Sequence, residues 1–335
     1  MPRSLLNVVL LLNVVLLLPL ASCSHDAHPA LPVRLAVGGQ AQLIYLVATV
    51  AQELGYYRDE SLDVTIQDFP GGSKSLEALL GGSTDVVCGF YDHTIQMAAQ
   101  GKDVRAFLSV LRYPGLVAVA ASPKISKIED LKGGVVGVSS AGSSTHMFLN
   151  YLLTTHGIAP DQVSIASIGM SATAVAAITH SNVDAAIMTD PALGIVREKM
   201  PGLRILADTR TAAGTREVFD VDEYPSVVLY STSRWLASHP EEARRIARAG
   251  LRTMEWLRSS SSSQINDRLP SQFRTGNGAV DAAGIEALKA MLSRDGKLSL
   301  DAAAAVKKVL SVSIADLRTA NIDLATTFTN QFTGK

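Results

Sequence analysis

The chain has 335 residues, of which 47% are hydrophobic and 18% charged, and its formal net charge at pH 7 is −1. This length is enough to bury one large or two medium hydrophobic cores. Nucleic-acid binding depends on neutralising phosphates, and the near-neutral charge without a sustained run of Lys or Arg argues against it. We therefore expect no nucleic-acid partner.

The first 22 residues have the pattern of a secretory signal peptide. Arg3 is the only charge before an apolar run in which LLNVVL occurs twice. The run ends in LASC at 20–23, which resembles the bacterial lipobox, where the cysteine is lipidated and becomes the mature N-terminus. We predict a lipoprotein signal peptide over residues 1–22, lipidation of Cys23 and a tether over 23–32. A transmembrane anchor, or an ordinary signal with a chance cysteine, are the alternatives.

The second cysteine, Cys88, lies in an apolar run. If Cys23 carries a lipid, no intrachain disulfide can form, and stability must come from packing. The surrounding valines predict that Cys88 is a small buried hydrophobe and not a reactive thiol.

Strands and helices alternate from residue 33 to about 200, which is typical of parallel α/β sheets. Gly-rich loops separate the elements. We expect strands at 33–37, 62–66, 85–88, 104–110, 135–138, 163–168 and 183–188, and helices at 41–54, 74–80, 92–100, 144–155, 171–179 and from about 191. The cycle restarts at Leu131, so we predict two α/β units in one chain.

Two extended segments without helical spacing, 113–120 and 224–230, are predicted to be crossings between these units. After the second, residues 240–258 have apolar positions at helical spacing among many Arg and Glu, which predicts an amphipathic helix packed on one unit. The serine run 259–263 is predicted to be a linker, followed by helices at 281–293 and 300–310.

The stretch Leu131–Phe148 predicts a strand, a Gly/Ser loop and a helix in succession. Gly142 permits a tight backbone, and Ser143, Ser144 or Thr145 can cap the helix. A helix N-terminus leaves amide groups unpaired and carries partial positive charge, so it can bind oxygen atoms of a polar ligand. Phe69–Leu80 repeats the same arrangement.

Three motifs, taken together, resemble a known family. They are Phe69–Gly72 leading into Ser75–Leu79 and Gly82–Asp85, Leu131–Gly133 leading into Gly142–His146, and Asn182–Ala185 with Asp190-Pro191. In order and spacing they resemble the periplasmic solute-binding proteins of ABC importers for sulfonates, taurine, nitrate and thiamine-pyrimidine precursors. The resemblance covers nearly all of the chain after the signal peptide.

The resemblance implies a two-lobed α/β periplasmic-binding-protein fold. Each lobe would be a mostly parallel sheet flanked by helices, and two crossing segments would join them. Lobe 1 would comprise residues 33–114 and 231–335, and lobe 2 residues 115–230 with the hinge crossings. Ligands of α/β sheets lie at the carboxyl ends of the strands. The expected protein is a lipid-anchored monomer in the periplasm or on the outer face of the cytoplasmic membrane. It would capture a small polar, anionic or heteroaromatic organic solute and deliver it to an ABC importer permease, without a cofactor or metal.

Carried over to this chain, the resemblance assigns ligand contacts to loops of both lobes. These residues are Gln40, Gly71, Gly72, Ser73, Tyr91, Ser140, Gly142, Ser143, Ser144, His146, Thr189 and Asp190. Their expected roles are hydrogen bonding and dipole stabilisation, and His146 would either touch the ligand or orient the loop.

Two positions leave the ligand class open. The loop Phe90–His93 departs from the small-residue loop frequent in the family, which suggests a larger, more aromatic ligand; alternatively Asp92 and His93 cap the following helix. Arg112 would either pair with a carboxylate or sulfonate or be a solvated hinge residue.

An enzyme on the same fold is the main alternative, because related chains synthesise the thiamine pyrimidine or dehydrate a menaquinone precursor. The chain lacks the cysteine-rich motif of the pyrimidine synthases, and it has no Gly-x-Ser-x-Gly and no metal-ligand spacing. We therefore predict no catalysis. A ligand-sensing lipoprotein that signals to a membrane receptor is the remaining alternative.

Overall fold

The structure is a computed structural model that describes residues 30–334. It contains two five-stranded β-sheets. Sheet A has the strand order β2 (Leu62–Asp68), β1 (Leu31–Val37), β3 (Val86–Phe90), β10 (Val227–Thr232), β4 (Val104–Ser109). Sheet B has the order β7 (Ser164–Ser167), β6 (Val135–Val138), β8 (Ala185–Met188), β5 (Val117–Ala120), β9 (Arg204–Asp208).

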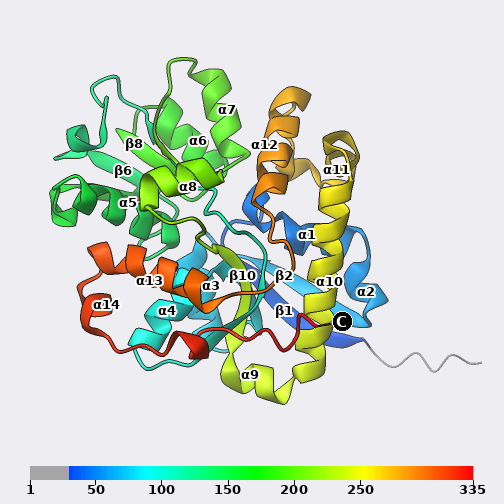
Figure 1. The fold of residues 1–335 in the computed structure, drawn as a ribbon. Coiled ribbons are helices and arrows are strands. Elements are labelled where there is room, and N and C mark those ends of the chain that lie inside the picture. The colour runs from blue at the N-terminus through cyan, green and yellow to red at the C-terminus, as the bar shows by residue number, and fades with distance from the viewer. Residues whose placement is uncertain (1–29, 335) are drawn as a thin grey trace, which may run out of the picture.

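In each sheet one internal strand, β10 or β5, is antiparallel to both of its neighbours, and the other strands are parallel to one another. The predicted two-lobed α/β fold with mostly parallel sheets is confirmed. We call sheet A with its covering helices lobe A, and sheet B with its covering helices lobe B; they form the two halves of the molecule in Figure 1.

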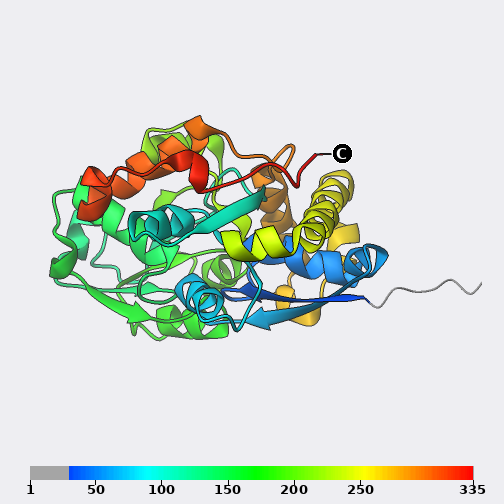
Figure 2. The same cartoon turned by 90° about the horizontal axis from the view of Figure 1, so that it is seen from below.

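Helices cover both sheets (Figures 1 and 2). Lobe A has α1 (Leu46–Glu53), α2 (Tyr56–Asp59), α3 (Gly72–Leu80), α4 (Asp92–Ala99), α9 (Ser233–Ser238) and α10 (Pro240–Ser259). Lobe B has α5 (Ser144–Thr155), α6 (Ala172–Thr179), α7 (Ala192–Lys199) and α8 (Ala212–Phe219). The chain ends with α11 (Ser262–Arg268), α12 (Gly278–Met291), α13 (Leu300–Ser313) and α14 (Ala315–Thr319). Short 3₁₀ turns occur at Leu43–Tyr45, Ile128–Leu131, Pro160–Gln162, Ser271–Phe273 and Leu324–Thr326.

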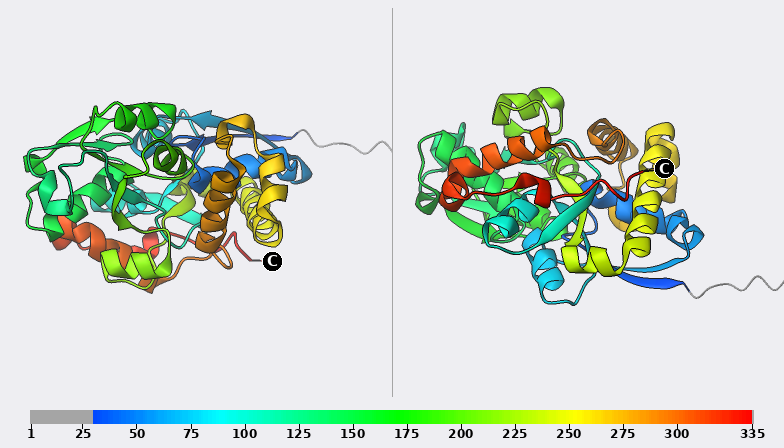
Figure 3. Two further views of the ribbon diagram at one scale, coloured as in Figure 1. Left: turned by 90° about the horizontal axis from the view of Figure 1, so that it is seen from above. Right: turned by 60° about the horizontal axis from the view of Figure 1, so that its bottom comes forward.

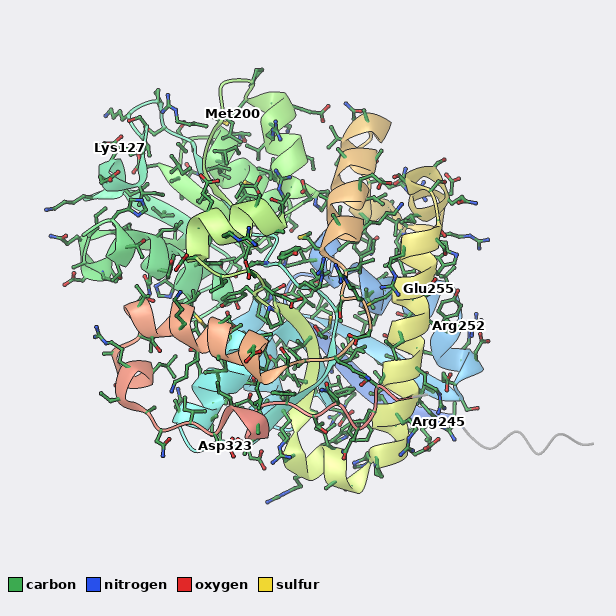
Figure 4. The ribbon with its side chains drawn as sticks, in the orientation of Figure 1. Lys127, Met200, Arg245, Arg252, Glu255 and Asp323 are labelled. Carbon is green, nitrogen blue, oxygen red and sulfur yellow. The ribbon has the colours of Figure 1, made fainter. Side chains whose placement is uncertain are left out.

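Helix α10 is the amphipathic helix that the sequence predicts, and it packs on lobe A against α1 and α2. Its apolar face is fully buried, while its arginines lie along the outside. Figure 4 shows Arg252 on the side of α10 that faces α2, where its guanidinium lies over the Tyr56 ring at 3.9 Å and binds Asp59 at 2.6 Å.

Burial follows the pattern of the strands. Strand β3 is buried along its whole length because it lies inside sheet A between β1 and β10. In β5, Val117 and Val119 face one hydrophobic cluster and Ala118 and Ala120 the other, as side-chain alternation requires. Cys88 in β3 is a free, fully buried thiol, as predicted, and burial raises its pKa to about 12.

Two segments connect the lobes and lie side by side. The chain leaves lobe A between β4 and β5 and returns between α8 and β10. The Tyr224 amide donates to the Arg112 carbonyl at 3.0 Å, and the Ser226 amide donates to the Leu111 carbonyl at 2.9 Å. The paired crossings predicted from the sequence are therefore present, and the predicted lobe boundary at residue 230 falls inside β10.

The C-terminal helices reach from lobe A to lobe B. Helix α13 lies against both α5 and α4, directly beneath α5 in Figure 1. Helix α12 stands between α7 and α11 (Figure 3). Gly284 of α12 lies close to Asp190, where a Cβ atom would approach the Asp190 side chain at 3.5 Å.

Some elements differ from the prediction. Strand β9 and helices α2, α8, α11 and α14 were not expected. The predicted serine linker is in part the start of α11, because Ser261 caps this helix and forms a capping box with Gln264. The predicted signal peptide and Cys23 lie outside the described residues. Within residues 30–334, no helix combines the length and the apolar character that crossing a membrane requires.

Candidate ligand-binding site

Two serine-rich loops, one from each lobe, meet face to face. Residues 69–71 link β2 to α3, and residues 139–143 link β6 to α5. Ser73 Oγ, in the first turn of α3, lies 2.8 Å from Ser140 Oγ and 3.2 Å from Ser143 Oγ, and the Ser73 amide donates to Ser143 Oγ at 3.1 Å. Ser140 Oγ and Ser143 Oγ are 2.7 Å apart. The lobes are thus in a closed arrangement in which the two Gly/Ser loops predicted to contact the ligand touch directly.

Glycine is required at this contact because no side chain fits between the loops. A Cβ atom on Gly71 would collide with Ser140 Oγ and lie 3.1 Å from Ser143 Oγ, both in the opposite lobe. A Cβ atom on Gly38 would lie 2.5 Å from the Gly72 amide nitrogen. The loops after β1, β2 and β6 therefore converge at one place.

The N-terminus of α5 points at this contact. Ser143 is its N-cap residue, yet the Ser143 hydroxyl makes no capping hydrogen bond and instead binds Ser73 and Ser140. A serine at this position normally accepts a hydrogen bond from an amide in the first turn of its own helix. The partial positive charge of the α5 N-terminus is thus available to groups between the lobes.

Asp92, the first residue of α4, is buried at the boundary of the lobes with 2% of its surface exposed. Its Oδ1 accepts a 2.9 Å hydrogen bond from Ser144 Oγ, at the start of α5 in lobe B. Burial raises the pKa of the Asp92 carboxyl, while His93 and the Ser144 hydrogen bond act in the opposite direction. The alternative in which Asp92 caps α4 is wrong, because the N-cap residue is Tyr91 and the helix has no side-chain cap.

His93 lies directly behind the first loop and is 1% exposed. Its Nδ1 is 3.3 Å from the Tyr230 hydroxyl. Within the part of the chain that the structure describes, its Nε2 has no hydrogen-bond partner, and it lies 4.0 Å from Asp92 Oδ1. Burial lowers the pKa of His93.

Gln42 reaches across the boundary and Gln40 does not. The buried Gln42 side chain accepts a 3.0 Å hydrogen bond from Thr189 Oγ1 of lobe B and donates to the Gly38 carbonyl at 2.6 Å. Gln40, which the sequence predicts as a ligand contact, donates from its side chain to Thr49 Oγ1 in its own lobe at 3.2 Å. Thr189 lies directly after β8, and its hydroxyl faces lobe A.

Asp190 takes part in an ion-pair network. Arg210 forms ion pairs with Asp190 at 3.1 Å and with Asp208 at 2.6 Å. The hydrogen bonds to Asp208 raise the pKa of Arg210 most, burial lowers it, and the charge of Asp190 raises it further. The Asp190 carbonyl also accepts a 2.9 Å hydrogen bond from the Leu43 amide of lobe A. Asp190 thus joins the lobes through its backbone while its carboxylate is occupied by Arg210.

The other predicted residues differ in what they contact. His146 Nδ1 accepts a 3.1 Å hydrogen bond from the Gly142 amide, which fits the orienting role, and burial lowers the pKa of His146. Tyr91 is fully buried and its hydroxyl is hydrogen-bonded to Thr327 of the C-terminal segment, so it is not brought to the loops.

Arg112 lies on the first crossing segment and does not reach the loops. Its Nε is 3.9 Å from a carboxylate oxygen of Glu223, and its guanidinium carbon lies 5.0 Å from the centroid of the Tyr113 ring. This position fits the reading of Arg112 as a hinge residue.

Two small cavities, of about 10 Å³ each, remain between the lobes and share Phe90, Leu116 and Ser144. One is lined by residues of the Gly/Ser loops, by Gln42 and Met170, and by the apolar side chains of Ile44 and Tyr45. The other contains Asp92 and a group of aromatic side chains, Phe148, Tyr151, Phe219 and Tyr224. A cavity of this size holds about one water molecule. Among residues 30–334, no three His, Cys, Asp or Glu side chains converge as metal ligands.

Sequence reasoning missed Gln42, the Asp92–Ser144 pair, Met170 and Arg210. A signal was present for Asp92, because a carboxylate in a run of apolar and aromatic residues after a buried strand is costly unless it has a partner. Its partner is 52 residues away in the other lobe, and no local pattern indicates such a pairing.

Two lobes joined by paired crossings are the fold of periplasmic binding proteins, and solved structures share this fold with the chain. A protein of Bordetella bronchiseptica RB50 has a TM-score of 0.86 and 35% identity, covering 92% of this chain and 96% of that one. The alkanesulfonate-binding protein SsuA from Xanthomonas axonopodis pv. citri, solved with MOPS, has a TM-score of 0.67 and 19% identity over 90% of this chain and 99% of its own.

The sequence comparisons give the family. The family model described as NMT1/THI5 like matches residues 45–260, and the chain belongs to this family. A candidate binding protein of Brucella abortus strain 2308 is 26% identical over 201 residues, or 60% of this chain. The match spans 59% of the length of that relative.

Proposed function

We propose that the chain is an exported solute-binding protein that captures a small polar organic solute between its lobes and delivers it to the permease of an ABC importer. The observation that carries this proposal is the meeting of the two Gly/Ser loops across the lobe boundary, each at the start of a helix. Support also comes from the fold it shares with the alkanesulfonate-binding protein SsuA.

The hinge supports capture by closure. The two crossings lie side by side and are paired by the hydrogen bond from the Tyr224 amide to the Arg112 carbonyl, so both can act as one hinge between the lobes. A solute that contacts both loops favours the closed form by the difference between its affinities for the closed and open forms. The closed shape is then the form that a permease recognises.

The small cavities indicate how the solute enters. Pockets for small organic molecules usually have volumes of several hundred Å³, whereas each cavity here has about 10 Å³. The lobes must therefore separate to admit the solute, and the serine hydroxyls must exchange their contacts with each other for contacts with it.

The hydroxyl groups favour binding over catalysis. Ser140 Oγ is hydrogen-bonded to two other serine hydroxyls, and Ser144 Oγ donates directly to a carboxylate. A serine nucleophile needs a base that accepts its proton, usually an imidazole oriented by a third group. We therefore propose a binding protein and not an enzyme.

Export and anchoring complete the proposal, with a signal peptide over residues 1–22 and lipidation of Cys23. Replacing this residue, Cys23→Ala, is expected to leave an uncleaved or soluble product. Globomycin sensitivity, membrane fractionation and the mass of the N-terminal peptide measure this. A lipid-modified, membrane-bound product from the variant would contradict the lipidation site.

The transport role is tested with the permease reconstituted in vesicles. The wild-type chain with its solute is expected to stimulate ATP hydrolysis by the importer, and the chain without solute to stimulate it less. Signalling to a histidine kinase without uptake would instead support the sensor role.

A further inference from the structure

Asp92 is a buried carboxylate at the boundary where the solute is proposed to lie. Its contact with lobe B is made by Ser144 Oγ at 2.9 Å, at the start of α5. The space beside Asp92 is the cavity that contains the group of aromatic side chains, and its lining includes Asp92, Ser144 and Phe148. His93, whose Nε2 has no hydrogen-bond partner among residues 30–334, lies 4.0 Å away.

The charges around this place do not suit an anion. Arg210 is already bound by Asp190 and Asp208, and Arg112 lies towards Glu223. Neither of the two cavities described above is lined by a Lys or Arg side chain. An anion placed here would face the Asp92 carboxylate with only the N-terminal dipoles of α3 and α5 to balance it.

We propose that Asp92 selects the solute, by accepting a hydrogen bond from a nitrogen-bearing group that takes the place of the Ser144 hydroxyl. This inference rests on the proposed function. It narrows the solute from an anionic or heteroaromatic molecule to a nitrogen base or a zwitterion, whose N–H group reaches Asp92 while its oxygen atoms lie against the Gly/Ser loops.

The energetics agree with this assignment. A hydroxyl only partly compensates a buried carboxylate, and burial accordingly raises the pKa of Asp92. An ammonium or amidinium would form a charge-assisted hydrogen bond and restore the ionised form. The aromatic side chains beside Asp92 can pack against the apolar part of such a solute, and their ring faces attract cations.

The test has two arms. In the first, native mass spectrometry of the protein purified from its host identifies the solute that stays bound. In the second, isothermal titration calorimetry measures the binding of paired probes that share a skeleton, one with an amino group and one with a hydroxyl in its place. The pairs are taurine with isethionate, ethanolamine with ethylene glycol, and benzylamine with benzyl alcohol. The variant is Asp92→Asn, with Asp63→Asn on the exposed face of β2 as the matched control.

The expected result is a bound solute with an N–H group. We expect it, or the nitrogen member of a probe pair, to bind at least tenfold more weakly to Asp92→Asn than to wild type and the control. Melting temperature and circular dichroism check that the variant is folded. A variant that weakens both members of a pair equally would show that Asp92 only holds the lobes together, which overturns the selection role.

Other outcomes separate the inference from the proposed function. A bound solute without any N–H group, or a preference for isethionate over taurine, overturns the role of Asp92 and leaves solute binding intact. No bound solute in the purified protein, together with no binding of any probe, overturns the proposed function itself.

Discussion

The contact between the Gly/Ser loops makes Gly71→Ala an informative perturbation. The added methyl group would collide with Ser140 Oγ, and the three atoms nearest to it all belong to Ser140 and Ser143 of the opposite lobe. The Gly71 backbone has φ 180°, an extended conformation that alanine adopts without strain. The substitution should therefore hinder closure of the lobes while each lobe stays folded.

The size of the effect follows from the hydrogen bonds that must be lost. Moving the Ser140 hydroxyl away breaks its bonds to Ser73 Oγ at 2.8 Å and to Ser143 Oγ at 2.7 Å. Each bond contributes a net of about 0.5–1.5 kcal/mol, so closure becomes less favourable by about 1–3 kcal/mol. In the bound form these hydroxyls are proposed to contact the solute in place of each other, so the methyl group removes contacts of similar strength from the bound form. The expected loss of affinity is about 5- to 150-fold.

Isothermal titration calorimetry with the solute found by mass spectrometry measures the affinity, and small-angle scattering measures closure as a decrease in the radius of gyration. Gly202→Ala is the matched control, because a Cβ atom there meets nothing within 4 Å. The double variant Gly71→Ala/Ser140→Gly should regain part of the affinity. Wild-type affinity and full closure in Gly71→Ala would refute the reasoning.

Three further predictions concern stability. Phe219→Ala should lower the free energy of unfolding by about 3–5 kcal/mol in urea, because Phe219 is 4% exposed and packs among three aromatic rings; a loss below about 1 kcal/mol would contradict this. A double-mutant cycle of Gln42→Leu and Thr189→Val should give a coupling energy of about 0.5–1.5 kcal/mol, and strict additivity would show that the hydrogen bond contributes nothing. Burial lowers the pKa of His93, so the folded chain keeps its imidazole neutral where the unfolded chain binds a proton. The wild-type protein should accordingly lose stability as the pH falls below 6.5, the ordinary pKa of a histidine side chain. The His93→Gln variant should lose less stability over the same pH range. Equal pH profiles of the melting temperature would contradict this assignment.

Local signals explain how much of the fold the sequence predicts. The β-branched strand at 135–138 and the helix at 144–155 were predicted within their observed bounds, because a valine run, a Gly/Ser loop and helical spacing follow one another without ambiguity. Strand β9 was missed because it is a half-exposed edge strand in which arginine and aspartate obscure the alternation. Helix α11 was missed because a run of serines was interpreted as a linker, although the pair Ser261 and Gln264 is a capping-box signal.

The candidate site was predictable where it depends on loop chemistry. Ser73, Ser140 and Ser143 follow strand ends of two mostly parallel sheets, and the structure brings them within hydrogen-bonding distance of one another. Gln42 and Asp92 were not assigned because their partners lie in the other lobe, and spacing along the chain does not indicate which side chains meet across a hinge.

The central claim is that a small solute binds between the lobes, and native mass spectrometry of the purified protein tests it most directly. The wild-type chain is expected to carry the mass of one small molecule, which is released on denaturation. The variant Gly71→Trp, which fills the contact between the loops, is expected to show the bare mass of the chain. Its melting temperature should equal that of the wild-type chain after its solute has been removed. A bare wild-type chain, or a Gly71→Trp chain that retains the same small molecule, would contradict the account.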